Sequence, residues 1–201
     1  TPLLEKDEKV RRSLGFRGSQ DYNIPIRHYR SSDFANLLRK ALYKKRLQPL
    51  RFSKHNTASF IKKHISEKIW SSYFKFSFVR NPFDRAVSFY YWRTGKSRPD
   101  IGNYLNSTPP HVLSNWNIYT IQDHVAVDFV GRYENLQDDL DNVADQIGLS
   151  NGVKLPSAKS GHRPSRAHYS EILSKEARQR IELVCAKEIK KFGYGWKSEL
   201  R

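Results

Sequence analysis

The chain has 201 residues, 38% of them hydrophobic and 13% aromatic, which excludes a disordered chain and fits one domain or a domain with a small appendage. Thirty-six Lys and Arg residues against twenty Asp and Glu residues give a formal net charge of +16 at pH 7. This charge predicts an anionic partner, which could be nucleic acid, a polyanionic glycan or a phosphate-rich cofactor. Composition alone does not choose among the three.

Cysteine content and hydropathy narrow the class of protein further. Cys185 is the single cysteine, which excludes an intrachain disulfide and a cysteine-based metal site and favours a reducing compartment. No run of eighteen apolar residues occurs, so we expect no membrane-spanning segment in this sequence. The expected location is therefore cytoplasmic.

The first half of the chain is basic and then turns apolar. Residues 1–50 are rich in Lys and Arg, and their apolar spacing predicts helices over 3–14 and 33–47. A third helix is expected over 57–64. The near-continuous apolar and aromatic run at 74–79 predicts a strand buried in a parallel sheet.

A helix should follow this strand at once. Asn81 is a suitable N-cap, and Pro82 suits the first helical position, where its missing N–H costs nothing. Residues 104–117 contain two prolines and several Asn and Ser residues, so a loop is expected there.

The second half of the chain repeats the order of strand and helix. A strand is expected over 125–132 and a helix over 135–147, which Gly148 ends. A polar, basic loop over 150–168 leads to a final helix over 174–192. Strands that alternate with helices predict an α/β fold with a mainly parallel sheet, formed by a single domain over residues 1–201.

The end of the first strand is the most informative position in the sequence. Ligands of parallel α/β sheets collect beyond the carboxyl ends of the strands, where the N-terminus of the next helix attracts anions. Arg80 lies at this point, and Ser88 follows two turns into the helix on the same face as Asp84. A phosphate could be held by Arg80 and Ser88 together. The alternative is that Arg80 pairs with Asp84 while Ser88 points to solvent.

Residues 79–90 read VRNPFDRAVSFY, which closely resembles the 3′-phosphate-binding motif of sulfotransferases that use 3′-phosphoadenosine 5′-phosphosulfate (PAPS). The resemblance implies that Arg80 and Ser88 hold the 3′-phosphate of PAPS and of its product, 3′-phosphoadenosine 5′-phosphate (PAP). It also implies a parallel sheet flanked by helices, related to the fold of P-loop kinases.

Two later segments are similar to the same enzymes. Residues 129–136, FVGRYENL, resemble a strand-to-helix segment whose tyrosine lies near the adenine, a role that would fall to Tyr133. The alternative for Tyr133 is packing against the core. The segment KSGHR at 159–163 falls where these enzymes have a basic loop that closes on the phosphates, which would make Lys159, Ser160 and Arg163 phosphate ligands. The alternative is a solvated basic loop.

The segment SKHNT at 53–57 lies about twenty residues before the strand, as does a histidine segment in the carbohydrate-specific and bacterial members. A histidine with a pKa near neutral suits removal of the acceptor proton, so His55 is the candidate general base, with a surface or structural role as its alternative. One departure concerns the donor loop. These enzymes normally carry a Pro-Lys-x-Gly-x-Thr loop that holds the 5′-phosphosulfate, and we find no such loop.

The sequence therefore predicts a sulfotransferase that moves a sulfuryl group from PAPS to a hydroxyl or amine, on a small molecule or an acidic glycan. Aromatic residues of the 92–116 segment would line the acceptor site; these are Tyr104, His111 and Trp116. The alternative is that they are packing anchors of the fold. No metal is expected. The alternatives are a non-catalytic module that binds PAP or a sulfated glycan, and location in the Golgi lumen with an anchor upstream. Specific nucleic-acid binding is not expected, because no known motif for it is present.

Overall fold

The computed structural model describes residues 25–27, 50–52, 55–95, 97–149 and 167–196. The chain divides into two compact units, Thr1–Ser66 and Glu67–Arg201. The single domain expected over the whole chain stays a prediction. The helices expected over 3–14 and 33–47 lie outside the described residues.

The first unit contains a short antiparallel pair and one helix. Strand β1 (Pro25–Arg27) pairs with β2 (Leu50–Arg51), and helix α3 (Ala58–His64) follows. The hydroxyl of Thr57 accepts a hydrogen bond from the backbone N–H of Phe60 at 3.2 Å, so Thr57 is the N-cap of α3. The helix expected over 57–64 is therefore confirmed.

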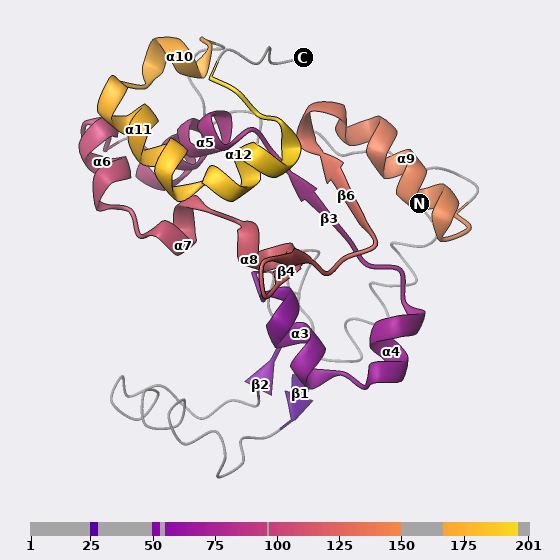
Figure 1. The fold of residues 1–201 in the computed structure, drawn as a ribbon. Helices are drawn as coiled ribbons and strands as arrows, with labels where there is room; N and C mark the ends of the chain where they lie inside the picture. The colour runs from indigo at the N-terminus through magenta and orange to yellow at the C-terminus, as the bar shows by residue number, and fades with distance from the viewer. Residues whose placement is uncertain (1–24, 28–49, 53–54, 96, 150–166, 197–201) are drawn as a thin grey trace. The chain divides into compact units, whose positions relative to one another are not determined.

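The second unit is built around a parallel pair of strands. After the short helix α4 (Glu67–Ser72), strand β3 (Phe76–Val79) pairs in parallel with β6 (Phe129–Arg132), and the two lie side by side in Figure 1. The expected mixture of helices with a parallel sheet is confirmed for these two strands. The order of a P-loop kinase sheet is a finer prediction that they do not test.

Gly131 allows the two strands to pack closely. It pairs with Phe78 across the sheet, and a Cβ atom at Gly131 would lie only 2.5 Å from the Cε1 atom of Phe78. The phenylalanine ring therefore covers the glycine, and a larger residue at this position would displace it.

The strand expected over 125–132 is shorter in the structure. His124–Val125 forms strand β5, which pairs with β4 (Thr120–Ile121) in a separate hairpin. Gln122 and Asp123 make its turn, with φ angles of 50° and 65°. Two positive φ angles in a two-residue loop are typical of a hairpin that connects right-handed twisted strands. The segment predicted as one strand therefore contributes β5 to one sheet and β6 to another.

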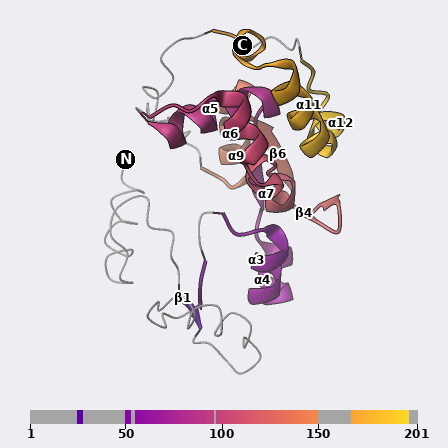
Figure 2. The same cartoon turned by 90° about the vertical axis from the view of Figure 1, so that its left-hand side faces the viewer.

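Helix α5 (Pro82–Thr94) follows β3 as expected. The side-chain oxygen of Asn81 accepts a hydrogen bond from the N–H of Phe83 at 3.0 Å, and Pro82 occupies the first helical position. The buried side of α5 packs against α6 (Ile101–Ser107), α10 (Tyr169–Ile172) and α11 (Lys175–Val184), as the turned view in Figure 2 shows for α6 and α11. The buried residues of this core are Phe83, Ala86, Val87, Leu105, Leu113, Tyr169, Leu173, Ala177, Ile181 and Cys185.

The loop expected over 104–117 is wrong. Most of this segment is helical, in α6, α7 (Pro110–Leu113) and α8 (Trp116–Tyr119). Asp100 caps α6 through the N–H of Asn103 at 2.9 Å, and the second proline occupies the first position of α7. The prolines and small polar residues therefore start and end short helices, where these residue types are favoured.

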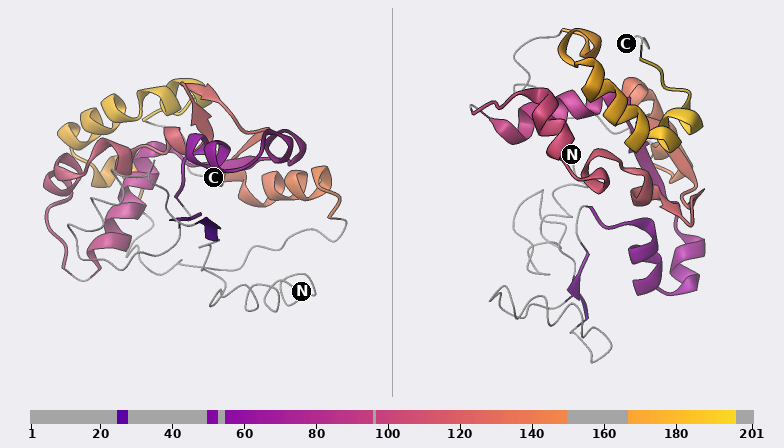
Figure 3. Two further views of the ribbon diagram at one scale, coloured as in Figure 1. Left: turned by 90° about the horizontal axis from the view of Figure 1, so that it is seen from below. Right: turned by 60° about the vertical axis from the view of Figure 1, so that its left-hand side comes forward.

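Two more helices complete the second unit. A 3-10 turn (Tyr133–Asn135) leads into α9 (Leu136–Gln146), and Gly148 follows with a φ of 73°. Helix α9 lies on one side of the two strands and the helical core on the other (Figures 1 and 3). The final helix expected over 174–192 is divided at Cys185 into α11 and α12 (Ala186–Phe192).

Candidate functional site

The candidate site lies where β3 and β6 end. Val79 and Arg132 are partners in the parallel register, so Arg80 and Tyr133 both follow directly at the same edge. The guanidinium carbon of Arg80 lies 4.1 Å from the centre of the Tyr133 ring, which is a cation–π contact. Tyr133 remains 48% exposed. The structure thus brings together two residues that the sequence marked in separate motifs.

Arg80 is also held by the helix that follows it. Its Nε donates to the Oδ2 of Asp84 at 2.6 Å, and Nη2 of the same guanidinium contacts that oxygen. The ion pair named as the structural alternative is therefore present. An arginine carries five N–H donors in a fixed fork, more than one carboxylate oxygen takes, so the pair orients the guanidinium without using all its donors.

Ser88 lies one helical turn beyond Asp84 and is partly exposed. Residues four apart on a helix are neighbours, with Cβ atoms about 5–6 Å apart. Since Asp84 holds Arg80, the guanidinium lies against the turn of α5 that precedes Ser88. This is the face on which the sequence placed both residues, and whether they bind a phosphate stays a prediction.

The backbone at the start of α5 is bound by protein groups. The N–H of Asn81 donates to Oε1 of Glu134 at 2.7 Å, and the N–H of Phe83 donates to the Asn81 side chain. These are two of the backbone donors that a helix N-terminus could offer to an anion. Because both are bound by protein groups, side chains such as Arg80 gain importance for an anion at this edge.

Behind the strand ends lies a polar network that the sequence pattern did not mark. The second carboxylate oxygen of Glu134 accepts from the Tyr194 hydroxyl at 3.1 Å. Burial, with the negative charge of Glu134 second, raises the pKa of Tyr194 well above its ordinary value. Asn81 Nδ2 donates to the Tyr169 hydroxyl at 3.2 Å, which in turn donates to the carbonyl of Gly195 at 3.0 Å. The network links the start of α5 to the C-terminal segment.

Comparison with known proteins identifies the family of the chain. The sulfotransferase family matches residues 22–109. An uncharacterised protein of Archaeoglobus fulgidus is 35% identical, in an alignment covering 46% of this chain and 82% of that protein. The chain belongs to the sulfotransferase family. Carbohydrate sulfotransferase 14 of Mus musculus is 28% identical, over 46% of this chain and 34% of the mouse protein, so the chain spans about a third of that relative. No solved structure matches the chain.

The family match contains three of the predicted site residues, which are His55, Arg80 and Ser88. Tyr133 lies beyond the matched range. His55 is exposed and belongs to the first unit, so its proposed contact with the acceptor stays a prediction. The predicted phosphate ligands Lys159, Ser160 and Arg163 lie outside the described residues.

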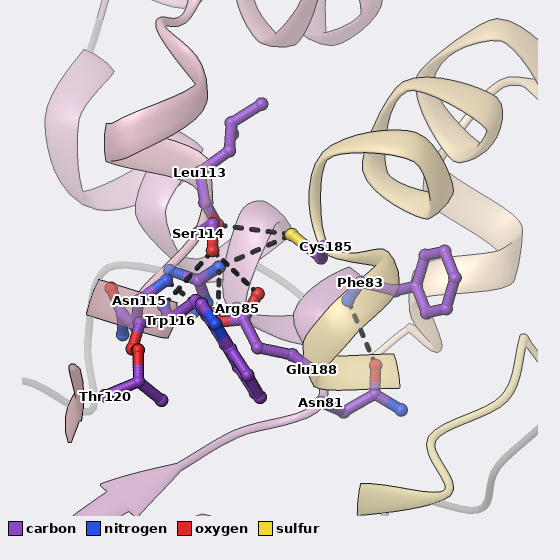
Figure 4. A network of polar contacts seen from close by, with 10 residues as sticks. All are labelled: Asn81, Phe83, Arg85, Leu113, Ser114, Asn115, Trp116, Thr120, Cys185 and Glu188. Atoms are coloured by element: carbon purple, nitrogen blue, oxygen red, sulfur yellow. Dashed lines mark hydrogen bonds and ion pairs between the residues drawn. The ribbon is translucent and has the colours of Figure 1, made fainter. Parts of the chain in front are cut away.

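The second arginine of the motif, Arg85, has a different environment from Arg80. Arg85 lies between α5 and α12, with its Nη2 3.7 Å from the Cys185 sulfur and 3.9 Å from Oε1 of Glu188 (Figure 4). Glu188 is buried, and it accepts hydrogen bonds from the Ser114 hydroxyl at 2.9 Å and the Asn115 N–H at 2.8 Å. Arg85 therefore belongs to a structural network that fastens the 114–115 turn to α12.

Burial, followed by the charge of Glu188, raises the pKa of the Cys185 thiol to about 12. The thiol therefore stays neutral at physiological pH, and it donates to the carbonyl of Leu113 at 3.5 Å. A buried, protonated thiol of this kind is inert as a nucleophile. Cys185 is therefore a structural cysteine.

The residues predicted to line an acceptor site lie on three different helices. Tyr104 on α6 packs its ring edge-on against Tyr90 at 5.4 Å. His111 on α7 is exposed, and the indole N–H of Trp116 at the start of α8 donates to Asp123 at 3.0 Å. Tyr104 thus has a packing partner and Trp116 a hydrogen-bond partner within the fold, and their role toward an acceptor stays a prediction.

Metal and membrane features complete the description. The part of the chain that the structure describes contains no cluster of three or more His, Cys, Asp or Glu side chains able to hold a metal ion. Of the helices described, none has the length and apolar character required to cross a membrane.

Proposed function

We propose that this sulfotransferase uses PAPS and transfers its sulfuryl group to a hydroxyl or amine. The observation that carries the proposal is the position of Arg80. It follows directly after β3, lies against the exposed ring of Tyr133, and is held by Asp84 one turn from Ser88. A cation, a hydroxyl and an aromatic ring at the end of parallel strands suit a 3′-phosphorylated adenosine.

Each residue has a distinct part in holding the nucleotide. Arg80 would donate two hydrogen bonds to the 3′-phosphate, and Ser88 would add a third from its hydroxyl. Tyr133 would stack on the adenine, since an exposed aromatic ring suits a flat purine. Lys159, Ser160 and Arg163 would close on the phosphates as the sequence predicts.

Lys54 is the candidate for the missing donor loop. Strand β2 ends at Arg51 and α3 begins at Ala58, so the residues between them, FSKHNT, connect a strand to a helix as the donor loop of this family does. The lysine of Pro-Lys-x-Gly-x-Thr falls on Lys54, with Ser53 in place of the proline, Asn56 in place of the glycine and Ala58 in place of the threonine. These changes hide the loop from a pattern search. Lys54 itself lies outside the described residues.

The transfer step needs charge stabilisation and one proton acceptor. A lysine beside the 5′-phosphosulfate would stabilise the negative charge that develops on the leaving phosphate oxygen. His55, the next residue, would take the proton of the attacking hydroxyl or amine as the sulfuryl group transfers in line. This chemistry requires no metal.

The acceptor class is inferred from the charge of the chain and from one relative. The net charge of +16 suits an acidic glycan, and one relative is named a carbohydrate sulfotransferase. A small hydroxylated or amino compound is the other acceptor class. A carbohydrate acceptor would fit the Golgi lumen, the alternative to the cytoplasmic location expected from the sequence.

Loss of the donor-loop glycine is the observation that favours the second function, a non-catalytic PAP- or glycan-binding module.

Calorimetric titration of PAP and AMP tests the nucleotide assignment. We expect wild type to prefer PAP and Arg80→Ala to lose most of that preference, since a charge-assisted bidentate contact contributes on the order of 1.5–3 kcal/mol, or roughly 10- to 150-fold. Arg93→Ala removes the same charge from an exposed position in the last turn of α5 and should leave the preference intact. Equal affinity of wild type for the two nucleotides would overturn the assignment.

A further inference from the structure

Glu134 links three segments at the edge where the nucleotide is proposed to bind. It directly follows Tyr133 after β6, accepts the N–H of Asn81 at the start of α5 at 2.7 Å, and accepts the hydroxyl of Tyr194 at 3.1 Å. Each of the two residues joined by this hydrogen bond lies next to a residue that is proposed to bind the nucleotide. Asn81 follows Arg80, and Glu134 follows Tyr133.

The bond to Asn81 constrains Arg80 through the backbone. The N–H of Asn81 belongs to the peptide unit that also contains the carbonyl of Arg80, and this unit is planar. The hydrogen bond to that N–H therefore restrains rotation about the Cα–C bond of Arg80. This restraint orients the backbone of Arg80 at the end of β3, from which its side chain projects. The same carboxylate fixes the backbone that carries Tyr133.

A carboxylate close to a phosphate site would oppose phosphate binding if it faced the ligand. Here both oxygens of Glu134 accept hydrogen bonds from protein donors, and bonds to a charged acceptor are stronger than neutral ones. The contacts therefore indicate a positioning role for Glu134 and no direct contact with the ligand.

We infer that Glu134 is a positioning residue that sets the spacing of Arg80 and Tyr133, so that preference for a 3′-phosphorylated nucleotide depends on it. The inference rests on the proposed function of the same edge. A positioning role requires a side chain of a specific length and hydrogen-bonding geometry at residue 134. A role through charge alone would require neither.

Four substitutions separate geometry from charge, with PAP and AMP affinities measured by calorimetry on the full chain. Glu134→Ala should lower PAP affinity about tenfold or more and bring the ratio of the two affinities toward one, because it removes the bond that orients Arg80. Glu134→Asp keeps the charge but is one methylene shorter, so it should lose much of the ratio. Glu134→Gln should keep the ratio, since its oxygen can accept from Asn81 and its amide can donate to the Tyr194 hydroxyl. Tyr194→Phe should also keep the ratio, because the Asn81 bond remains.

Val143→Ala is the control for a general loss of stability. Val143 is buried in α9, away from the hydrogen bonds of Glu134, so its truncation should lower the melting temperature and leave the ratio unchanged. If Val143→Ala lowers the ratio of PAP to AMP affinity as much as Glu134→Ala does, at a comparable loss of stability, the inference would be overturned.

The outcomes distinguish the inference from the proposed function. If wild type prefers PAP and both Glu134→Ala and Glu134→Asp retain that preference, the positioning role is wrong while the nucleotide assignment stands. If Glu134→Ala does not fold, the Asp and Gln variants decide in the same way. A wild type without any preference for PAP would overturn the proposed function and the positioning role together.

Discussion

Arg80 combines an observed structural contact with a proposed binding role, which the sequence presented as alternatives. Its ion pair with buried Asp84 is present, and its position at the strand end against Tyr133 is the one that the proposed nucleotide binding needs. The pair orients the guanidinium before any ligand arrives, which lowers the entropy that ligand binding must overcome. The structural contact is therefore compatible with the proposed binding function of the same side chain.

Lys54 and His55 are adjacent but should differ in what they contribute. Lys54→Ala should weaken transfer from PAPS because it removes the cation beside the leaving oxygen. His55→Ala should lower turnover by roughly 10²–10⁴-fold and leave PAP affinity nearly unchanged, because proton removal matters in the transition state and not in nucleotide binding. Transfer is measured with PAPS and the best acceptor from a panel of phenols, amines and desulfated glycans.

Lys62→Ala, in the last turn of α3, serves as the matched control for the loss of a nearby charge. A His55→Ala variant with wild-type turnover would show that another group or solvent removes the proton. A Lys54→Ala variant with wild-type turnover would show that Lys54 is not the donor-loop lysine. The two results are independent, so one assignment can fail while the other holds.

At the level of elements, the helix after β3 was predictable because its signals are local. Asn81 and Pro82 lie at the positions where a cap and a first-turn proline are favoured, and both take these roles in the structure. The loop expected over 104–117 was wrong because the same residue types also start short helices. Composition alone does not distinguish a loop from a series of short helices, because the difference depends on which helices pack against the core.

The break between α11 and α12 and the role of Glu134 depend on distant partners. Cys185, at the break, contacts Leu113, which is 72 residues earlier, and Glu134 contacts Asn81, which is 53 residues earlier. Periodicity carries no information about such contacts, so the sequence predicted one continuous helix and no role for Glu134. Arg80, Ser88 and Tyr133 could be named as candidates from the sequence because motifs mark them, and their binding role stays a prediction.

Glu188 offers a test of how the helices are fastened together. Glu188→Ala should lower the free energy of unfolding by about 3 kcal/mol, because it leaves the Asn115 N–H, the Ser114 hydroxyl and part of the Arg85 charge without their partner. Glu188→Gln should cost less, since it can still accept a hydrogen bond. Urea unfolding followed by circular dichroism measures the difference.

Glu182→Ala is the control for this change. Glu182 pairs with Arg178 on the surface of α11, with 40% of each side chain exposed, so its loss should cost under about 1 kcal/mol. Equal destabilisation by the two alanine variants would show that the buried network does not stabilise the fold. PAP affinity of Glu188→Ala should stay close to that of wild type, because none of the Glu188 partners lies at the strand ends.

At the scale of the whole molecule, the charge of +16 predicts attraction to any polyanion, and the proposed site predicts selectivity. Binding through net charge and binding at the proposed site can be distinguished because their affinities depend differently on salt concentration. Binding through general basicity releases counterions in proportion to the phosphates contacted, whereas a built nucleotide site relies on a few oriented donors. Duplex DNA and PAP are suitable probes of the two modes.

Between about 50 and 200 mM salt, affinity for duplex DNA should fall by roughly 10³–10⁵-fold if six to ten phosphates are contacted, without preference for sequence. Affinity for PAP should fall far less over the same range, because only the proposed phosphate contacts are screened. Fluorescence anisotropy with labelled DNA and calorimetry with PAP measure both, and Arg80→Ala should affect PAP much more than DNA. Tight, sequence-specific DNA binding that survives salt, together with no binding of PAP, would mean that the charge serves nucleic acid and that the strand-end arginine has only its structural role.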